Sequence, residues 1–318
     1  MIDLESFLIH NKIKYEKNVS LRKKTWLKTG GIAQYWVEPN SVSDLLSCVE
    51  FFNLHNQKYE IVGHTSNIYY LPNYNPNIIV STQKLTDFTE EEDCLVCECG
   101  VSVAKLSKYS VSKGWVGFSG LINLPGTIGA ATYNNSSCFD CSISSLLISV
   151  DYYDTDQNKV IRLLKDDLQY SFRSSIFKRK EISGVILCVR LRKEQGDKSI
   201  ETSKADAASR IRKLTQEPPA FTLGSVYAGL KYKRTVLNIF ILKIASFLNY
   251  FGFDKNKIQK TLFIFINGYR DIGPCISNKN INTFKWLPTR DSFKDFMRYQ
   301  SLIKTVCHNP KLEIEIRG

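Results

Sequence analysis

The sequence lacks a continuous apolar run long enough to cross a membrane. Its most apolar stretch, residues 236–253, is interrupted by Asn238, Lys243 and Asn249, whereas a spanning helix needs about 20 mostly apolar residues. We therefore expect a buried or amphipathic helix there and no membrane span. The first ten residues lack both the basic start and the long apolar region of a secretory signal peptide, so we expect a cytoplasmic protein.

Low-complexity tracts and internal repeats are also absent, and histidine is scarce, with four residues in 318. With 43% apolar and 23% charged residues, the composition excludes a disordered chain, and the length favours two or three domains. His10, His55 and His308 have no Asp or Glu at the spacing of a metal site or a catalytic triad. We expect them to be ordinary surface or core residues.

The charge is unbalanced, because 43 Lys and Arg residues exceed 31 Asp and Glu residues and give a formal charge of +12. Such an excess favours anionic partners. The basic residues are dispersed in small groups, such as 22–24 and 178–180, and none accompanies a recognised nucleic-acid-binding motif. Nucleic-acid binding therefore rests on charge alone. We expect small phosphorylated partners and no nucleic acid.

The nine cysteines are expected to be reduced thiols if the protein stays in the cytosol. They include two C-x-x-C pairs, Cys94 with Cys97 and Cys138 with Cys141, and such pairs can bind zinc. The pairs are farther apart than in common zinc fingers, and the first reads as part of a strand, where positions three apart point to opposite faces. Zinc remains the weaker alternative, and we expect no metal.

Short β-like runs alternate with helical patterns over much of the chain, which indicates an α+β fold. Strands are expected at 35–37, 59–62, 77–81, 94–99, 147–152 and 184–192, and helices at 44–52, capped by Ser41 or Ser43, and at 103–113. The polar stretch 193–208 reads as a surface linker into a helix that ends near Leu214. Beyond it we expect helices at 236–251 and 293–306 and a strand at 312–316.

The linker predicts a division into domains 1–193 and 194–318, the first with subdomains of about 1–82 and 83–193. Three glycine-rich loops lie in the first domain, at 29–31, 63–67 and 124–131. Glycine lets backbone N–H groups approach an anion closely, so such loops suit a phosphate. None has the G-x-G-x-x-G or P-loop spacing, which excludes a Rossmann or Walker site.

These loops occur in the order found in UDP-N-acetylenolpyruvoylglucosamine reductases, and the resemblance spans residues 25–191. The family's G-x-G-S-N loop resembles 63–67, and its G-I-P-G-(T/S)-V-G-G-A loop resembles 123–131. The resemblance implies an FAD-binding PCMH-type fold, similar to vanillyl-alcohol oxidase, followed by a smaller mixed α/β substrate domain. The implied FAD-binding residues are Gly63, His64, Thr65, Ser66, Asn67, Pro125, Gly126, Thr127, Gly129 and Asn135. Noncovalent FAD is expected; covalent attachment through His64 is the alternative.

Three further segments resemble the family's catalytic motifs. Residues 170–178 are similar to Y-R-x-S-x-F-K, which makes Arg173 the residue that contacts the enolpyruvyl group. Gly224-Ser225 resembles the Gly-Ser whose serine protonates the intermediate, with Lys231 or Lys233 as neighbours that could support it. The closing segment 312–318 resembles L-E-P-E-V, which assigns Glu315 to the active site. Alternation along that segment predicts one buried face made of Leu312, Ile314 and Ile316.

The resemblance implies that hydride from NADPH, relayed through FAD, reduces an enolpyruvyl ether on a UDP-sugar to a lactyl ether, as in UDP-N-acetylmuramate formation for peptidoglycan. The chain departs from the family at Thr65, at Phe172 in place of a tyrosine, and at 226–229 after the serine. Two alternatives therefore stay open. One is a flavin-dependent oxidoreductase on another nucleotide-sugar of surface polysaccharide synthesis, and the other is a non-catalytic sugar-nucleotide-binding paralogue.

Overall fold

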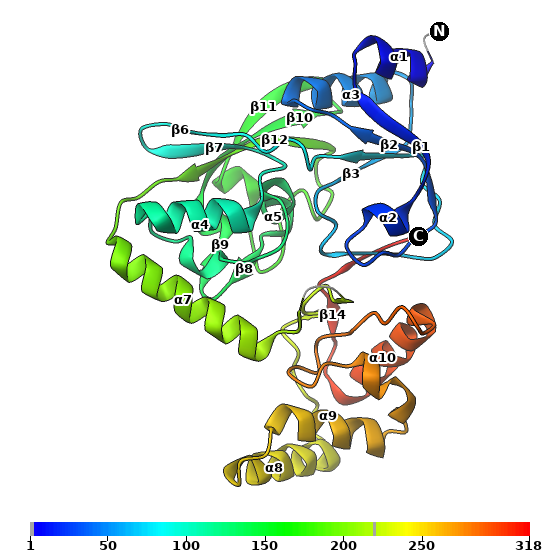
Figure 1. Cartoon of the computed structure of the whole chain (residues 1–318), viewed down its shortest axis with the longest axis vertical. Coiled ribbons are helices and arrows are strands. Elements are labelled where there is room, and N and C mark those ends of the chain that lie inside the picture. Colours follow the sequence, from blue (N-terminus) through cyan, green and yellow to red (C-terminus); the bar gives the residue numbers. More distant parts are fainter. Residues whose placement is uncertain (1–2, 219–220) are drawn as a thin grey trace. The chain divides into compact units, whose positions relative to one another are not determined.

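The computed structural model describes residues 3–218 and 221–318, which divide into two compact units (Figure 1). The first unit contains residues up to 25, 30–66 and 74–209. The second contains 26–29, 67–73 and 210–318. The second unit is therefore built mainly from the C-terminal third, with two short segments from the N-terminal part of the chain.

One sheet of the first unit is formed by the N-terminal strands. Its order is β1-β2-β5-β3, with β1 antiparallel to β2 and the other neighbours parallel. Helix α3 (Val42–Leu54) begins where Ser41 Oγ accepts the Asp44 N–H at 3.0 Å, and its buried side includes Leu45 and Phe52. The other elements are α1 (Leu4–His10), β1 (Lys14–Ser20), α2 (Leu21–Lys24), β2 (Ile32–Glu38), β3 (Tyr59–Val62) and β5 (Ile78–Ser81).

The second sheet of the first unit is antiparallel, with the order β11-β10-β12-β7-β6. Its apolar side packs on helices α4 (Val103–Lys113) and α5 (Ile128–Asn134) through residues such as Leu95, Leu106 and Ile128. The other elements are β6 (Phe88–Glu90), β7 (Cys94–Glu98), β8 (Ser137–Cys138), β9 (Cys141–Ser142), α6 (Ile143–Leu146), β10 (Leu147–Asp154), β11 (Lys159–Leu164) and β12 (Gly184–Arg192).

The second unit joins helices to short strand pairs around an aromatic core. Phe296, Tyr299 and Phe284 are almost fully buried there. Strand β4 (Ile68–Tyr70) runs parallel to β15 (Glu315–Arg317), and β13 (Tyr227–Ala228) is antiparallel to β14 (Lys311–Leu312). The helices are α8 (Val236–Tyr250), α9 (Lys255–Ile266) and α10 (Ser292–Val306).

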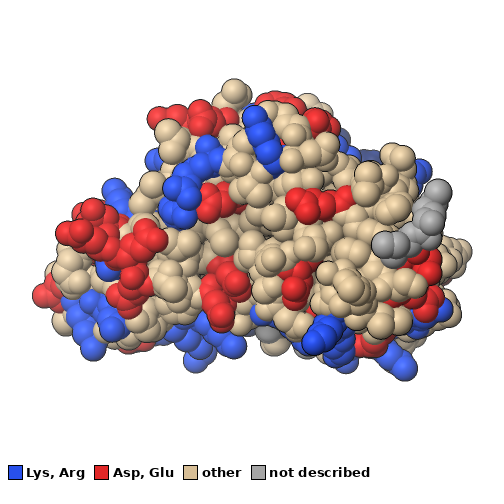
Figure 2. All heavy atoms as spheres, turned by 90° about the horizontal axis from the view of Figure 1, so that it is seen from above, with Lys and Arg blue, Asp and Glu red and all other residues tan. Residues whose placement is uncertain are grey.

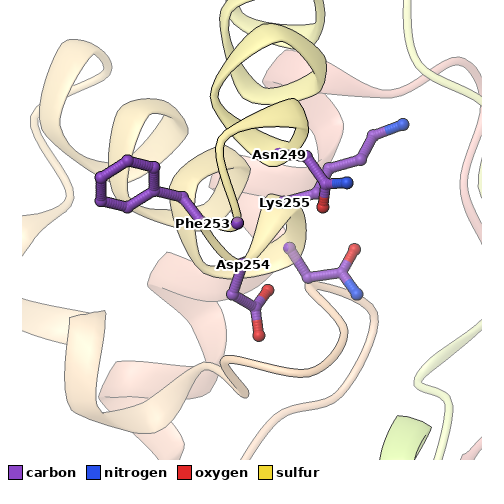
Figure 3. A pocket seen from close by; sticks show the side chains of 6 residues that line it. Asn249, Phe253, Asp254 and Lys255 are labelled. Atoms are coloured by element: carbon purple, nitrogen blue, oxygen red, sulfur yellow. The ribbon is translucent and has the colours of Figure 1, made fainter.

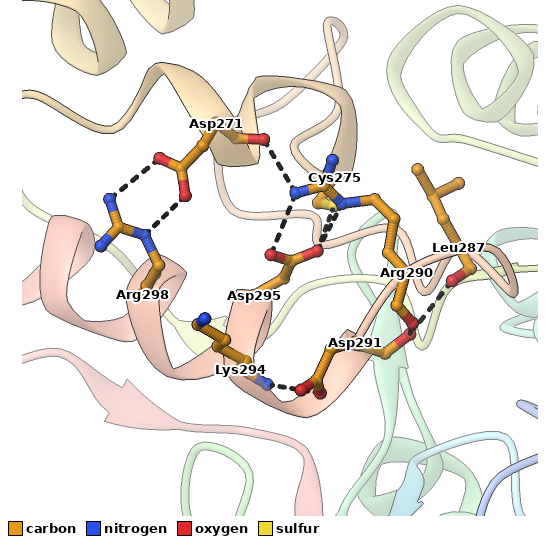
Figure 4. A network of polar contacts seen from close by, with 9 residues as sticks. Asp271, Cys275, Leu287, Arg290, Asp291, Lys294, Asp295 and Arg298 are labelled. Atoms are coloured by element: carbon orange, nitrogen blue, oxygen red, sulfur yellow. Dashed lines mark hydrogen bonds and ion pairs between the residues drawn. The ribbon is translucent and has the colours of Figure 1, made fainter.

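A polar network fixes the start of α10 (Figure 4). The guanidinium of Arg290 holds the buried carboxylate of Asp295, with Nη2 3.1 Å from Oδ1. The Cys275 thiol donates to the same carboxylate at 3.4 Å, and Asp271 pairs with Arg298. The hydrogen bond from Arg290 lowers the pKa of Asp295 below its usual value, so the carboxylate stays charged although it is buried.

Two predicted elements were wrong. The expected linker 193–208 is helical from its sixth residue, because α7 (Lys198–Thr215) lacks Gly and Pro and buries Ala205 and Ala208. The expected closing strand 312–316 is two short strands with different partners, β14 and β15. The alternation argument therefore failed: Ile314 is buried, but Leu312 and Ile316 are exposed.

The cysteine pairs lie in strands. Cys94 and Cys97 belong to β7, and Cys138 lies directly opposite Cys141 in the β8–β9 hairpin. In residues 3–218 and 221–318, no cluster of three or more His, Cys, Asp or Glu side chains is arranged to hold a metal ion.

The charged residues are mixed on the face shown in Figure 2, where Lys and Arg are interspersed with Asp and Glu and form no continuous basic stripe. The positive charge on that face is therefore dispersed, as the sequence predicted. Within the described part of the chain, no helix is both long enough and apolar enough to cross a membrane.

Candidate functional site

Two of the predicted FAD-binding loops lie against each other in the first unit. The loop that begins at Gly63 follows β3, and the loop that contains Gly126 and Thr127 precedes α5. A Cβ atom on residue 63 would lie 2.9 Å from Cγ2 of Thr127 and closer still to its Oγ1, so only glycine permits this approach. A Cβ atom on residue 126 would lie 3.5 Å from Oγ of Ser66.

Backbone hydrogen bonds hold the second loop beside the end of β7. The Val103 N–H donates to the carbonyl of Gly126 at 3.1 Å, and the Gly129 N–H donates to the carbonyl of Cys99 at 2.8 Å. A Cβ atom on residue 129 would lie 2.8 Å from Cβ of Cys99. Thr127 Oγ1 caps α5 by accepting the Ala130 N–H at 3.4 Å. The loop therefore has little freedom to move.

Asn135 ends α5 in the left-handed conformation, with φ of 47°, which asparagine tolerates better than most residues. Its side chain is almost fully buried. Nδ2 donates to the carbonyl of Ser171 at 2.8 Å, while Oδ1 has no hydrogen-bond partner within the described part of the chain. A buried oxygen without a partner is costly, so a bound polar ligand would stabilise this position.

The segment that carries Arg173 is fastened to the end of α5. Tyr170 Oη donates to the carbonyl of Thr132 at 3.0 Å, and Ser175 Oγ donates to the carbonyl of Tyr133 at 2.6 Å. Together with the bond from Asn135, these contacts hold the segment on both sides of Arg173. The structure thus brings two separately predicted segments together.

Arg173 itself lies at the tip of a tight turn between Ser171 and Ser174, which exchange backbone hydrogen bonds of 3.2 and 3.1 Å. Its φ is 55°, an uncommon value outside glycine that often marks a functional position. Nη2 donates to the carbonyl of Ser137 at 3.0 Å. Because a guanidinium has five N–H donors in a planar fork, a side chain held in this way can still bind a carboxylate.

His64 is partly buried in the first loop. Burial, with a smaller contribution from Lys105, lowers the pKa of its imidazole. The ring is therefore neutral at neutral pH, since the ordinary pKa of histidine is about 6.5. Covalent attachment of FAD through His64 is not tested by this geometry, and noncovalent FAD stays a prediction.

In the second unit, backbone and side-chain hydrogen bonds connect the segments that carry Asn67, Ser225 and Glu315. Asn67 accepts the Glu315 N–H through its carbonyl at 2.9 Å and donates Nδ2 to the carbonyl of Glu313 at 3.1 Å. The Glu313 N–H in turn donates to the carbonyl of Val226, next to Ser225, at 2.9 Å. The segments of Asn67, Ser225 and Glu315 are therefore neighbours.

Ser225 is exposed and follows Gly224, whose φ is 76°. The proposed helper Lys233 instead donates to the carbonyl of Lys304 at 2.7 Å. Glu315 accepts a hydrogen bond from Nη2 of Arg317 at 2.9 Å. Arg173 belongs to the first unit and Ser225 and Glu315 to the second, so a single site made of all three stays a prediction.

Sequence reasoning missed Asn282, which fixes the backbone after Ser225. Its Oδ1 accepts the Tyr227 N–H at 2.9 Å, and its Nδ2 donates to the carbonyl of Tyr227 at 2.7 Å. Its carbonyl also accepts the Val226 N–H at 2.8 Å. No motif surrounds Asn282, and its partner is far away in the sequence, so no local signal could have identified it.

A hollow of about 450 Å³ lies at the turn between α8 and α9 (Figure 3). It is lined by Asn249, Gly252, Phe253, Asp254, Lys255 and Asn256. None of these residues was predicted to bind substrate or cofactor.

Comparisons with known proteins agree with this geometry. Residues 33–163 match a family described as an FAD binding domain. The UDP-N-acetylenolpyruvoylglucosamine reductase of Thermosipho melanesiensis is 31% identical over 225 residues, which are 69% of this chain and 74% of that protein. That of Caldicellulosiruptor saccharolyticus is 26% identical over 215 residues, 68% of this chain and 69% of that protein.

Among solved structures, the UDP-N-acetylenolpyruvylglucosamine reductase from Thermus caldophilus has a TM-score of 0.69 and 16% sequence identity, covering 96% of this chain and all of that one. This likeness concerns the fold. The matched segment 33–163 contains the two loops at 63–67 and 124–131 and also Asn135. The close approach of the two loops and the buried, unpartnered Oδ1 of Asn135 suit a polar cofactor such as FAD. This chain is therefore a member of the UDP-N-acetylenolpyruvoylglucosamine reductase family, with an FAD-binding domain of the PCMH type.

Proposed function

We propose that this protein uses NADPH to reduce an enolpyruvyl ether on a UDP-sugar to a lactyl ether, as in UDP-N-acetylmuramate formation for peptidoglycan. The observation that carries the proposal is the attachment of the Arg173 turn to Asn135 and the end of α5, both of which lie in the segment that matches an FAD binding domain. The names of the relatives from Thermosipho and Caldicellulosiruptor support the same activity.

In this proposal, Gly63 to Asn67, the loop 125–129 and Asn135 hold the FAD. When bound, FAD supplies hydride transfer between the reduced nicotinamide and the substrate. Arg173 binds the enolpyruvyl group, and its guanidinium stabilises the negative charge that develops as the double bond is reduced. The carbonyl of Ser137 holds the guanidinium in place, so that little reorganisation is needed during the reaction.

Ser225 donates the proton that completes the reduction. A serine hydroxyl is a weak acid and is effective only when it is well positioned beside a stabilising group. The backbone that follows Ser225 is fixed by Asn282, which supports such positioning. Glu315, on the neighbouring segment and paired with Arg317, is the third residue that we assign to the site.

The proposal also covers the location of the protein, its role in the cell and its division into domains. We propose a cytoplasmic location and a role in cell-wall synthesis, in line with the family. The division into 1–82, 83–193 and 194–318 stays a prediction. What supports its first two parts is that the two sheets of the first unit use strands from residues 14–81 and 88–192.

A second candidate is a flavin-dependent oxidoreductase that acts on another nucleotide-sugar. The observation that favours it is Phe172, which is 70% exposed beside Arg173. An exposed apolar ring at this turn offers a different contact to substrate from the hydroxyl of the tyrosine that the family motif carries. This second candidate differs from the first in its sugar substrate and keeps FAD as its cofactor.

The test is the consumption of NADPH without oxygen in the presence of UDP-N-acetylenolpyruvoylglucosamine. We expect steady consumption and a product two hydrogens heavier than the substrate. Consumption that requires oxygen or another sugar would favour the second candidate. A protein that binds the nucleotide-sugar but never consumes NADPH would be a non-catalytic paralogue, and the proposal would be wrong.

Single variants test the roles of the residues. Ser225→Ala should still be reduced by NADPH but be reoxidised by substrate about 100-fold to 10,000-fold more slowly, the usual effect of losing a general acid. Arg173→Lys should also lose reoxidation by substrate, because an ammonium lacks the planar fork. Ser246→Ala, an exposed serine on α8, is the matched control and should behave like the parent.

A further inference from the structure

The most apolar helix of the chain is largely exposed. The sequence predicted a buried or amphipathic helix at 236–251, but the buried residues of α8 are Asn238, Ile241 and Ala245. Val236 is 88% exposed, Phe240 58%, Phe247 63% and Tyr250 87%. A helix of a soluble domain normally turns such residues toward the core, so this face requires another explanation.

The exposed apolar residues lie on one side of the helix. Positions 236, 240, 247 and 251 lie within about 60° of one another around a helix with 3.6 residues per turn. The ring of Phe251 packs edge-on against those of Phe247 and Tyr250, at centroid distances of 5.1 and 5.4 Å. We name Val236, Phe240, Phe247, Tyr250 and Phe251 the apolar face of α8. Contiguous exposed apolar patches usually mark a protein or membrane contact.

Positive charge surrounds the apolar face. Residues 231–260 contain one acidic residue, Asp254, whose carboxylate accepts the Lys257 N–H at 3.0 Å and so caps α9. Lys243 lies on the same side of α8 as Phe240 and Phe247, by helical spacing. The exposed basic side chains of this stretch are Lys231, Arg234, Lys243, Lys255 and Lys257.

We infer that the apolar face of α8 binds the surface of an anionic lipid bilayer, with the helix lying in the plane of the interface. An apolar face rimmed by Lys and Arg is the pattern of interfacial helices. The aromatic rings enter the boundary between headgroups and acyl chains, and the basic side chains contact lipid phosphates. This inference rests on the second unit alone and is independent of the proposed activity.

The same charges disfavour a second copy of this chain as the occupant. A two-fold contact centred on α8 would place Lys243, at the middle of the helix, near Lys243 of the other copy, and like charges across an interface are repulsive. A nucleic acid would satisfy the charge and could stack its bases on the aromatic rings, but it would leave the aliphatic side chain of Val236, which is exposed, in contact with water. An anionic bilayer is complementary to both.

Geometry excludes a spanning arrangement for α8. Its 15 residues extend about 22 Å at 1.5 Å per residue, less than the hydrocarbon core of about 30 Å. Asn249 near the end of α8 and Lys255 at the start of α9 border the hollow, and the ring of Phe253 points away from both (Figure 3). Asn249 and Lys255 offer hydrogen-bond donors at the level where lipid headgroups would lie.

The test is sedimentation of the full-length protein with vesicles of phosphatidylcholine alone or of phosphatidylcholine mixed with phosphatidylglycerol. We expect binding to the mixed vesicles that weakens with added salt. The double variant Phe240→Asp, Phe247→Asp should bind at least tenfold more weakly, and Lys243→Gln about fivefold more weakly, as for the loss of one basic residue near a charged surface. Leu54→Asp, at an exposed leucine on α3 in the first unit, is the control and should bind like the parent.

Phe247→Trp provides a second measurement in a variant that keeps the apolar character of the site. The fluorescence of the introduced tryptophan, taken as the difference between variant and parent, should shift to the blue when the mixed vesicles are added. Absence of parent binding to the mixed vesicles, or an unshifted emission from the introduced tryptophan, would overturn the inference. So would a parent dimer that Phe247→Asp dissociates and that binds no vesicles, since the occupant would then be a second copy.

Discussion

The contact between the two FAD-binding loops predicts that Gly63→Ala destabilises the first unit and weakens FAD binding. The new Cβ would lie 2.9 Å from Cγ2 and 3.2 Å from Cβ of Thr127, and closer to Oγ1. Thr127 cannot simply turn away, because its side chain is β-branched and its Oγ1 caps α5. One of the two loops must therefore move.

The magnitude follows from two costs. Overpacking of this kind costs about 1–3 kcal/mol, and loss of the threonine cap costs about 1 kcal/mol. The sum of roughly 2–4 kcal/mol corresponds to a decrease in Tm of about 4–16 °C for a domain of this size. Because both loops are predicted to hold FAD, the purified variant should also retain less of the cofactor.

The assay is thermal unfolding, monitored by the increase in flavin fluorescence as FAD is released from the protein. Gly273→Ala is the matched control, since a Cβ there has no neighbour within 4 Å, and its Tm should equal that of the parent. Thr127→Ala should lose only the cap, and the double variant Gly63→Ala, Thr127→Ala should unfold near Thr127→Ala because the obstacle is gone. The reasoning would be refuted if Gly63→Ala had the same Tm as Gly273→Ala. It would also be refuted if the decrease in Tm of the double variant equalled the sum of the decreases in the single variants Gly63→Ala and Thr127→Ala.

Three further results are expected. Asn135→Ala should lower both Tm and FAD content, because it removes the 2.8 Å bond to Ser171 and leaves alanine in the left-handed region; an unchanged FAD affinity would contradict this. The hydrogen bond from Arg290 lowers the pKa of Asp295, so its contribution to stability is complete above about pH 4 and lost as the pH falls below it; Asp295→Asn should flatten that acid dependence of the urea midpoint, and equal slopes would count against it. Burial lowers the pKa of His64, so stability should fall as the pH drops below about 6.5; His64→Gln should lose part of that fall, and an unchanged pH dependence in this variant would contradict the assignment.

Local sequence signals were sufficient for many elements. The predicted helix at 103–113 and the predicted strands at 59–62 and 184–192 coincide with α4, β3 and β12. Each has a clear apolar period, and α4 also has a serine cap and a C-terminal glycine. The family and the fold class predicted from the glycine loops are confirmed by the comparisons.

Where local pattern and tertiary context disagreed, the sequence was insufficient. Helix α9 was not predicted, because residues 261–266 are rich in the aromatic and β-branched side chains typical of strands. It is helical because Asp254 caps it and because Phe263 and Ile264 are buried against the core. The exposure of α8 was also missed, since composition alone shows that a helix is apolar but not what covers it.

Some residues of the candidate site could be predicted from the sequence and others could not. Arg173 and Asn135 could be identified from short motifs, and the structure shows the hydrogen bonds that join their segments. Asn282 could not, because its contacts with Tyr227 join positions far apart in the sequence. Such contacts depend on the completed fold and leave no periodic signal in the chain.

The most direct test of the proposed activity is a single turnover without oxygen. The purified protein is first reduced with NADPH until the flavin absorption is bleached, and UDP-N-acetylenolpyruvoylglucosamine is then added in excess. We predict that the absorption returns rapidly and that a lactyl ether forms in an amount equal to the flavin. Absorption that stays bleached with this substrate and with every other enolpyruvyl sugar tried, in a protein that binds FAD and reacts with NADPH, would contradict the proposed activity.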